Sequence, residues 1–349
     1  MLIRSASSYG SWFWQNFILR RTALFQCFLY VTHRCNLRCL YCNFPFLKTP
    51  ELTTHQWADI LDQLARLGCR RVTFLGGEPL LRPDLPDLLR HARRRGLSSV
   101  VSTNGLLVPE RIDALRPLQT LVISLDAAGP ANDGVRGQGV YDAVKAAIVA
   151  AKRARIPLKI NAVLSAKTAP ELDVLIRFVE DQDLHLTINV VRSGDPHLWR
   201  EARRIKAEDH EIRRLLLEIA ARAKRNRRIL LSPSSYRYAS LWRNYLDDRY
   251  EAGELDPDDP LLRKGPFCRA GRSYFNVNPD GTVSPCVTTM AKISGGNALE
   301  DGVEACWRTL QEHRCQACYS PCLVELNFLF SFNLRVLAGF ARRHLGRFG

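Results

Sequence analysis

The stretch CNLRCLYC, from Cys35 to Cys42, places three cysteines at a CxxxCxxC spacing. Cysteine thiolates hold iron–sulfur clusters, and a four-iron cluster offers four positions for ligands. Three thiolates on one loop therefore leave one iron without a protein ligand, free to bind a small molecule. A zinc site made from the same cysteines and His33 is the alternative interpretation of this loop.

The loop stands at the start of a repeated pattern of short β-rich runs and helical-period stretches. Helices are expected at 55–68 and 141–156, among others. The expected strands are FQCFLYVT (25–32), RRVTFLG (70–76), SSVVST (98–103), TLVISLD (120–126), PLKINAVL (157–164) and LHLTINVV (184–191). This alternation predicts an α/β fold, a partial (β/α)6 TIM-type barrel with a parallel sheet and helices outside it.

Polar or glycine-rich residues follow nearly every predicted strand. After the cysteine loop come GGEP at Gly76 to Pro79, STNG at Ser102 to Gly105, SLD at Ser124 to Asp126, and Asn161. Sites in α/β barrels are built at the carboxyl ends of the strands. We therefore expect all these motifs to meet at one mouth of the barrel.

The loop, with an aromatic residue at Tyr41, resembles the signature of the radical S-adenosylmethionine (SAM) superfamily. In that family three cysteines, here Cys35, Cys39 and Cys42, hold a 4Fe-4S cluster, and SAM occupies the fourth position. The resemblance implies a 5′-deoxyadenosyl radical that takes a hydrogen atom from a substrate. A barrel closed by a second domain would keep such a radical away from water.

The later motifs extend the resemblance over about 140 residues. GGEP looks like the family's glycine-rich turn, with Glu78 facing the methionine ammonium, and Arg136 resembles an arginine that pairs with the SAM carboxylate. Asn161 is a weaker match for a ribose contact, and strand-end capping is the alternative for the polar residues. The cofactor-binding residues implied are Tyr41, Gly76, Gly77, Glu78, Pro79, Ser102, Thr103, Asn104, Ser124, Arg136 and Asn161.

A second set of cysteines follows near the end of the chain, around an expected hairpin whose turn spans Asn278 to Gly281. With GGN at Gly295 to Asn297, it resembles the auxiliary-cluster domains of the SPASM and twitch subfamilies. That implies one auxiliary iron–sulfur cluster, 4Fe-4S by analogy, and a zinc module is the alternative. The ligands implied are Cys268, Cys286, Cys315 and Cys318, with Cys322 as a further candidate.

The remaining cysteines, Cys27, Cys69 and Cys306, read as small buried hydrophobic residues. The expected organisation has five parts. These are an N-terminal extension (1–24), the core barrel (25–197), a helical and linker region (198–263), the auxiliary-cluster domain (264–322) and an aromatic, basic C-terminal tail (323–349).

The formal net charge is +15, with much of the excess in a charged helical region from Leu198 to Arg228 and at the C-terminus. A solvated helix face explains such a pattern, and an anionic surface is the alternative. No aromatic-interleaved nucleic-acid motif accompanies it, so no nucleic-acid partner is expected. The tail from Leu323 to Gly349, taken as a helix, either caps the protein's own apolar surface or makes a peripheral membrane contact.

These features predict an enzyme in the cytoplasm, because no signal peptide is recognised and cysteines cluster as in metal sites. Membrane association through the tail is the alternative location. We expect a radical SAM oxidoreductase or maturase that oxidises or cross-links a peptide or protein. The N-terminal segment is short for a peptide-binding domain, so a small alcohol, sugar or lipid-like substrate is the alternative. An iron–sulfur scaffold without catalysis is the non-enzyme reading. An electron donor such as flavodoxin or ferredoxin is the expected protein partner.

Overall fold

The computed structural model describes residues 23–193 and 202–345. Most of the predicted extension 1–24 and the residues 198–201 therefore lie outside the described residues. The first half of the chain forms six parallel strands that lie side by side in sequence order. They are β1 (Gln26–Thr32), β2 (Arg71–Gly76), β3 (Ser98–Thr103), β4 (Thr120–Ser124), β5 (Leu158–Leu164) and β6 (Leu186–Val190).

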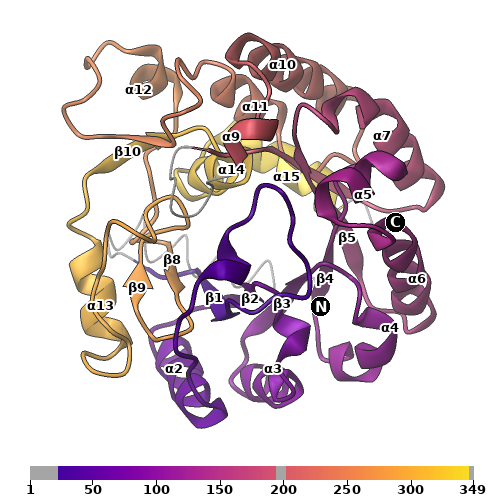
Figure 1. Cartoon of the computed structure of the whole chain (residues 1–349). Coiled ribbons are helices and arrows are strands. Elements are labelled where there is room, and N and C mark those ends of the chain that lie inside the picture. Colours follow the sequence, from indigo (N-terminus) through magenta and orange to yellow (C-terminus); the bar gives the residue numbers. More distant parts are fainter. Residues whose placement is uncertain (1–22, 194–201, 346–349) are drawn as a thin grey trace.

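Helices alternate with these strands and cover the outer face of the curved sheet (Figure 1). Each packs through an apolar stripe; in α2, for example, Trp57, Ile60 and Leu64 are buried. The helices are α2 (Thr54–Arg66), α3 (Leu85–Arg94), α4 (Val108–Arg111), α5 (Pro130–Arg136), α6 (Val140–Arg153) and α7 (Leu172–Asp181). The predicted α/β architecture with six βα units is confirmed.

The sheet is longer than the sequence pattern predicts, because later segments join both of its edges. Strand β8 (Tyr274–Val277) pairs in parallel with β1, and β9 (Val283–Ser284) completes the expected hairpin. At the other edge Leu186 of β6 exchanges backbone hydrogen bonds with Arg228 and Leu230, both 2.8 Å long. The cysteine-rich module is thus continuous with the barrel sheet through β1.

The described residues of the charged region between the two halves form two helices. A short α9 (Ala202–Ile205) precedes α10 (Asp209–Arg225), and Glu208 caps α10 in a reciprocal pair with Glu211. Ile212, Leu216 and Ile219 face the core, so the charged side chains occupy the outer face. There follow α11 (Pro233–Ala239), β7 (Arg249–Glu251), α12 (Pro260–Lys264), α13 (Val303–Leu310) and β10 (Cys315–Cys318).

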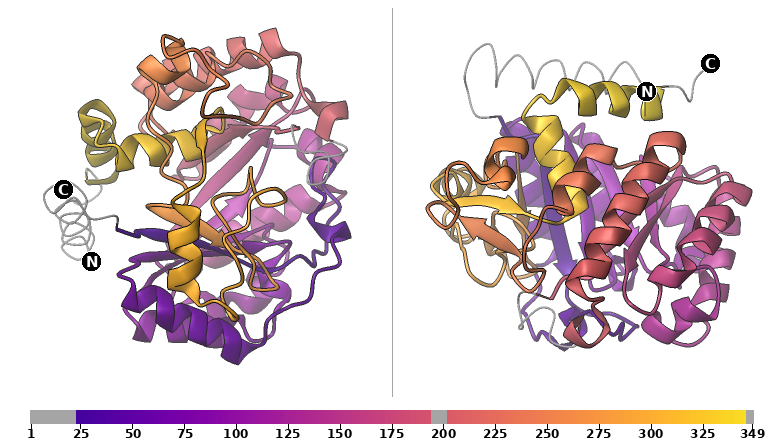
Figure 2. Two further views of the ribbon diagram at one scale, coloured as in Figure 1. Left: turned by 90° about the vertical axis from the view of Figure 1, so that its left-hand side faces the viewer. Right: turned by 90° about the horizontal axis from the view of Figure 1, so that it is seen from above.

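The C-terminal tail is a broken pair of helices instead of the single helix considered from the sequence. Helix α14 (Pro321–Phe330) is buried against α11 and β6, so this part caps the protein's own core. Phe332 takes a left-handed backbone conformation (φ 60°), and α15 (Leu334–Leu345) continues across the surface (Figure 2). Among the described residues no single helix has the length and apolar character needed to cross a membrane; α14 with Leu334–Phe340 of α15 meets those criteria only as a pair bent by 109°.

Candidate functional site

The first cysteine loop crosses the mouth of the barrel, between the end of β1 and a short 3-10 turn at Phe44–Phe46 (Figure 1). Cys35, Cys39 and Cys42 are free thiols, and all three are partly accessible. Burial raises the pKa of Cys39 to about 11 and that of Cys42 to about 12. A metal centre binds thiolates, so thiols of this kind give up their protons when iron is bound.

Backbone and side-chain contacts hold the loop against the strand ends. Asn104, just after β3, donates to Asn36 Oδ1 (2.7 Å) and contacts Cys35 Sγ (3.8 Å). The Leu40 amide donates to the carbonyl of Val135 in α5 (3.0 Å). The predicted SAM residue Asn104 therefore lies directly beside a cluster cysteine, where its amide orients the sulfur.

The two glycines of GGEP are required by the approach of the cysteine loop itself. A Cβ on Gly76 would lie 2.0 Å from the Thr32 carbonyl oxygen, and one on Gly77 would lie 2.2 Å from that of Arg34. The amides of Gly77 and Glu78 donate to these same two carbonyls (2.8 and 2.7 Å). The glycines were expected to let a ligand approach the backbone closely. In the structure, the backbone of the cysteine loop itself makes this close approach, and it joins the loop to β2.

Glu78 lies in the interior, and its expected contact with a ligand ammonium stays a prediction. Its side chain is fully buried and accepts from Thr103 Oγ1 (2.8 Å), the Leu80 amide (3.0 Å) and the Asn104 amide (2.7 Å). Burial raises its pKa to about 7, although these three donors act in the opposite direction. Glu78 therefore ties the glycine turn, with Pro79 opening its 3-10 segment, to the end of β3.

Arg136 also faces the interior, in a network that the sequence reading missed. Its Nε and Nη2 donate to the two carboxylate oxygens of Asp126 (2.8 and 3.0 Å), and Tyr41 donates its hydroxyl to the same carboxylate (2.9 Å). The Val163 amide adds a fourth bond (2.9 Å). Arg136 therefore pairs with Asp126 instead of meeting the SAM carboxylate through these two nitrogens.

This network links the cysteine loop, β4, α5 and β5 around one buried carboxylate. The arginine side chain is 6% exposed and Asp126 is fully buried. A signal for it was present in the SLD motif, since a carboxylate at a buried strand end needs a cationic or hydrogen-bonding partner. The sequence reading selected the serine of that motif and not the aspartate.

The other predicted polar residues line the inner face of the sheet near its mouth. Ser124 of β4 is directly opposite Asn161 of β5, and Ser102 lies two residues of register away on the neighbouring strand. Ser102 and Ser124 are half-buried. Asn161 Oδ1 accepts from Thr187 (2.9 Å) and from Asn189 (3.1 Å). The three predicted residues share one face, where they remain candidates for binding a polar ligand.

The second set of cysteines also comes together. Cys315 and Cys318 lie at the two ends of β10, and the thiols of Cys268 and Cys315 are hydrogen-bonded. That bond, together with burial and the nearby Cys286 and Cys318 thiols, raises the pKa of Cys315 well above its usual range. Four thiols gathered in an interior this dry are a donor set suited to iron.

The remaining cysteines divide as the sequence predicted. Cys27, Cys69 and Cys306 are buried among apolar neighbours. Cys322, in the first turn of α14, is half-buried; its amide donates to Asn189 Oδ1 of β6 (3.3 Å) and its sulfur contacts Ser320. Its role as a ligand stays a prediction. Across the described part of the chain, no three His, Cys, Asp or Glu residues converge closely enough to hold a single metal ion.

An apolar cluster connects the two cysteine modules across the mouth. Tyr30 of β1 stacks on Phe44 of the first loop, with ring centroids 5.5 Å apart. Cys42 packs against this pair, as do Val287 and Met290, which follow Cys286. Residues of both cysteine modules thus share one apolar cluster.

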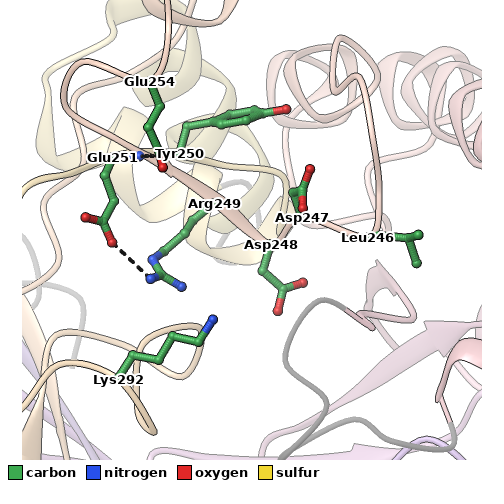
Figure 3. Close-up of a pocket in the computed structure, with 8 residues that line it drawn as sticks. All are labelled: Leu246, Asp247, Asp248, Arg249, Tyr250, Glu251, Glu254 and Lys292. Atoms are coloured by element: carbon green, nitrogen blue, oxygen red, sulfur yellow. Dashed lines mark hydrogen bonds and ion pairs between the residues drawn. The ribbon is translucent and has the colours of Figure 1, made fainter.

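A charged pocket of about 500 Å³ opens beside the second module (Figure 3). Its wall is β7, which pairs with β10 so that Arg249 lies opposite Cys318 and Glu251 opposite Cys315. Arg249 and Glu251 form an ion pair (2.9 Å), and Lys292 faces them from the loop after β9. The sequence reading described this stretch only as part of a helical and linker region, since no motif marks it.

Comparison with known protein families matches two segments of the chain. Residues 29–179 match the radical SAM superfamily, and residues 268–323 match the SPASM iron–sulfur cluster-binding domain. The match to the second cysteine module includes all five of its predicted ligands.

Similar proteins include two curated PqqA peptide cyclases. The one from Ruegeria pomeroyi is 34% identical over 265 residues, covering 73% of this chain and 66% of its own length. The one from Streptomyces rochei is 43% identical over 141 residues, covering 38% of this chain and 39% of its own length. The matched regions thus span less than two thirds of either relative.

Solved structures with a similar fold include Streptococcus suis SuiB bound to S-adenosylmethionine (TM-score 0.63, 19% identity, 88% of this chain and 70% of that one). SuiB bound to the precursor peptide SuiA has a TM-score of 0.61 at 19% identity, over 88% of this chain and 69% of that one. The anSMEcpe structure with AdoMet and the Cp18Cys peptide has a TM-score of 0.61 at 15% identity, over 93% and 97% of the two chains. These likenesses establish the shared fold.

Proposed function

Because this chain belongs to the radical SAM superfamily and carries a SPASM iron–sulfur cluster-binding domain, we propose that it is an enzyme that modifies a peptide by hydrogen-atom abstraction. The observation that carries the proposal is the loop of Cys35, Cys39 and Cys42 at the strand ends, with Asn104 on the sulfur of Cys35. A 4Fe-4S cluster with SAM supplies, when bound, the electron transfer and the 5′-deoxyadenosyl radical for the reaction.

The chain's own residues fit SAM in two places. Since Glu78 is fully buried, an ammonium group would find its acceptors among the carbonyl oxygens of the glycine turn. The half-buried hydroxyls of Ser102 and Ser124 and the amide of Asn161 lie on the inner face of the sheet, where they suit a ribose or a carboxylate. Tyr41 and Arg136 act through Asp126, by fixing the cysteine loop relative to β4.

The second module would hold one auxiliary cluster through Cys268, Cys286, Cys315 and Cys318. Cys322 faces Asn189 of the barrel, so it lies between this module and the space where a substrate would bind. A cluster at this place would accept the electron left on an oxidised substrate. Net oxidation or bond formation is therefore favoured over rearrangement.

A peptide is the substrate class that the comparisons support best. Two relatives are named PqqA peptide cyclase, and SuiB was solved with a precursor peptide. The charged pocket beside β7 is lined by the cations of Arg249 and Lys292 together with several carboxylates, which suits a peptide with ionised side chains. An electron donor such as flavodoxin or ferredoxin in the cytoplasm completes the proposal.

The test is anaerobic incubation of the reconstituted protein with SAM, a strong reductant and peptides encoded beside its gene. We expect 5′-deoxyadenosine in every incubation with reductant, and a mass loss of one or more pairs of hydrogen atoms in one peptide. A lipid or small alcohol that is consumed, with every peptide unchanged, would favour the alternative substrate. Absence of 5′-deoxyadenosine from iron-replete protein would leave only the scaffold reading.

A further inference from the structure

A basic pocket of about 440 Å³ lies between α10, α11 and α15, outside the site described above. Four cationic side chains line it: Lys224 at the end of α10, Arg227 just beyond it, Arg237 of α11 and Arg335 of α15. No carboxylate belongs to its lining as far as the structure is described. The pocket thus gathers positive charge from three helices that are distant in sequence.

The neighbouring cations of the same segment behave differently. Arg222 pairs with Glu218 (2.7 Å), and Arg228 pairs with Asp183 (2.7 Å). For the four pocket cations, no such ion pair is found within the described ranges, and all four side chains are exposed. The pocket therefore gathers four exposed cations for which no carboxylate partner is found among the described residues.

One buried carboxylate lies behind the pocket lining, at the start of α11, and faces inward. Glu325 of α14 accepts from the hydroxyls of Ser232 (2.5 Å) and Ser235 (2.6 Å) and from the Ser232 amide (2.9 Å). It is 4% exposed, so it fixes the start of α11 beneath the cations. Repulsion among the exposed cations is relieved only by an anion that enters from solvent.

Helix α15 places an apolar surface beside this charge. Val336 anchors the helix in the core, Leu334 is 76% exposed, and Leu337 and Phe340 are half-buried. An exposed leucine next to a pocket of arginines is the combination found in helices that lie in a bilayer interface, with cations near lipid phosphates. A free phosphate would use the cations but would leave this leucine in water.

We propose that the pocket binds the phosphodiester headgroup of an anionic phospholipid, and that α15 then lies in the bilayer interface. Both views of Figure 2 place α15 on the side of the molecule away from the cysteine loop. A membrane docked at α15 therefore leaves the barrel mouth open to the aqueous side. This inference is independent of the substrate, and it makes the membrane a place of attachment instead of a source of substrate.

The experiment is vesicle sedimentation of the full-length, cluster-loaded protein at low salt. Two arms use vesicles, either of phosphatidylglycerol with phosphatidylcholine or of phosphatidylcholine alone. A third arm adds inorganic phosphate without lipid and measures the unfolding temperature of the protein. The test variant combines Arg227→Glu, Arg237→Glu and Arg335→Glu. The matched control combines Arg66→Glu, Arg70→Glu and Arg93→Glu, which are exposed around α2 and α3. Each Arg→Glu change subtracts two charges, so both variants fall from +15 to +9.

We expect the wild type and the control to sediment with the anionic vesicles and not with phosphatidylcholine alone. The test variant should bind the anionic vesicles at least about tenfold more weakly than the wild type. Equal losses in both variants would mean that net charge alone attracts the protein, and the proposal would be wrong. The proposal would also be overturned if the wild type did not bind anionic vesicles, or if inorganic phosphate stabilised the protein saturably while no vesicle was bound. Production of 5′-deoxyadenosine by the test variant reports that it is folded.

Discussion

Glu78 and Asp126 are two buried carboxylates that follow β2 and β4, on either side of β3, and each fixes one part of the predicted cofactor site. Glu78 orders the residues after β3, including the Asn104 that contacts Cys35. Asp126 holds Tyr41 of the cysteine loop and Arg136 of α5. Neither carboxylate has exposed surface, so both act on the reaction by positioning other groups.

Replacing Glu78 by Gln should destabilise the fold by about 1–3 kcal/mol. The amide keeps one acceptor oxygen where the carboxylate satisfied three donors, so a buried N–H or O–H loses its partner. Thermal unfolding measures this, with the exposed Glu110→Gln as control. Full stability in the Gln variant would contradict the observed hydrogen bonding.

The difference in folding stability between the wild type and Glu78→Gln should depend on pH. Burial raises the pKa of Glu78 from its ordinary value of 4.5 to about 7, so its contribution favours the folded state most below about pH 4.5 and is lost as pH rises through about 7. The stability of the wild type relative to Glu78→Gln should therefore fall between about pH 5 and pH 7. A relative stability that rises over this interval would mean that Glu78 is ionised at low pH.

Asp126→Asn should have a larger effect, because it leaves the buried Arg136 without a counter-charge. Removing one partner of a buried ion pair costs about 3–5 kcal/mol. We expect a lower unfolding temperature and loss of iron from the first cysteine loop, measured by iron analysis after reconstitution. Asp113→Asn, which breaks the exposed pair with Arg116, is the matched control and should change neither.

At the scale of elements, the end of β2 and the first cysteine loop fit together without space for a side chain. Gly77 meets the Arg34 carbonyl, and the two adjacent amides of this turn donate to the loop that bears the cysteines. The position of the first cluster site is therefore set by backbone contacts between β1 and β2. Small side-chain changes at this junction should affect the whole loop.

Gly77→Ala should displace the cysteine loop, since its Cβ would lie 2.2 Å from a backbone oxygen that cannot move alone. The expected result is iron binding at the first site reduced several-fold, with iron at the second module retained. Gly134→Ala in α5 is the control: nothing lies within 4 Å of its Cβ, and Ala favours a helix. Normal iron content in Gly77→Ala would show that the junction between β2 and the cysteine loop has space for a Cβ at this position, and would contradict the prediction.

At the scale of the whole molecule, β1 is the element that joins the two cysteine modules. It leads into the first loop, and it pairs with β8 of the module that contains Cys268 and Cys286. The apolar cluster of Tyr30, Phe44 and Val287 fills the space beside it. The β1–β8 pairing therefore connects the first loop directly with the second module, although Cys315 and Cys318 lie on the separate two-stranded sheet of β10 and β7.

The fold and the cysteines could be predicted because their signals are local: strand periodicity, loop spacing and turn residues. The inward orientation of Glu78 could not, since it depends on the end of β3 lying beside the end of β2 in space. The pairing of Asp126 with Arg136 could not either, since it depends on how α5 turns back toward the end of β4. The same holds for the β1–β8 pairing, which joins residues nearly 250 positions apart. The break at Phe332 was hidden because an apolar phenylalanine gives no warning of a left-handed turn.

The second module should contain iron and sulfide and no stoichiometric zinc. Four cysteines, three of them buried, suit either metal by residue type, so elemental analysis of anaerobically purified protein is the deciding measurement. The variant with Ala at Cys268, Cys286, Cys315 and Cys318 should keep the iron of the first loop. Zinc near one equivalent in the wild type, lost in this variant, would contradict the auxiliary-cluster assignment.

The central claim is that Cys35, Cys39 and Cys42 hold the cluster that cleaves SAM. The most direct measurement compares the wild type with the variant that has Ala at all three positions, scoring both bound iron and 5′-deoxyadenosine after reduction with SAM present. We predict that the variant keeps the iron of the second module and makes no 5′-deoxyadenosine, because no other iron in the chain would have an open position. Production of 5′-deoxyadenosine by the triple variant at the wild-type rate would contradict the account.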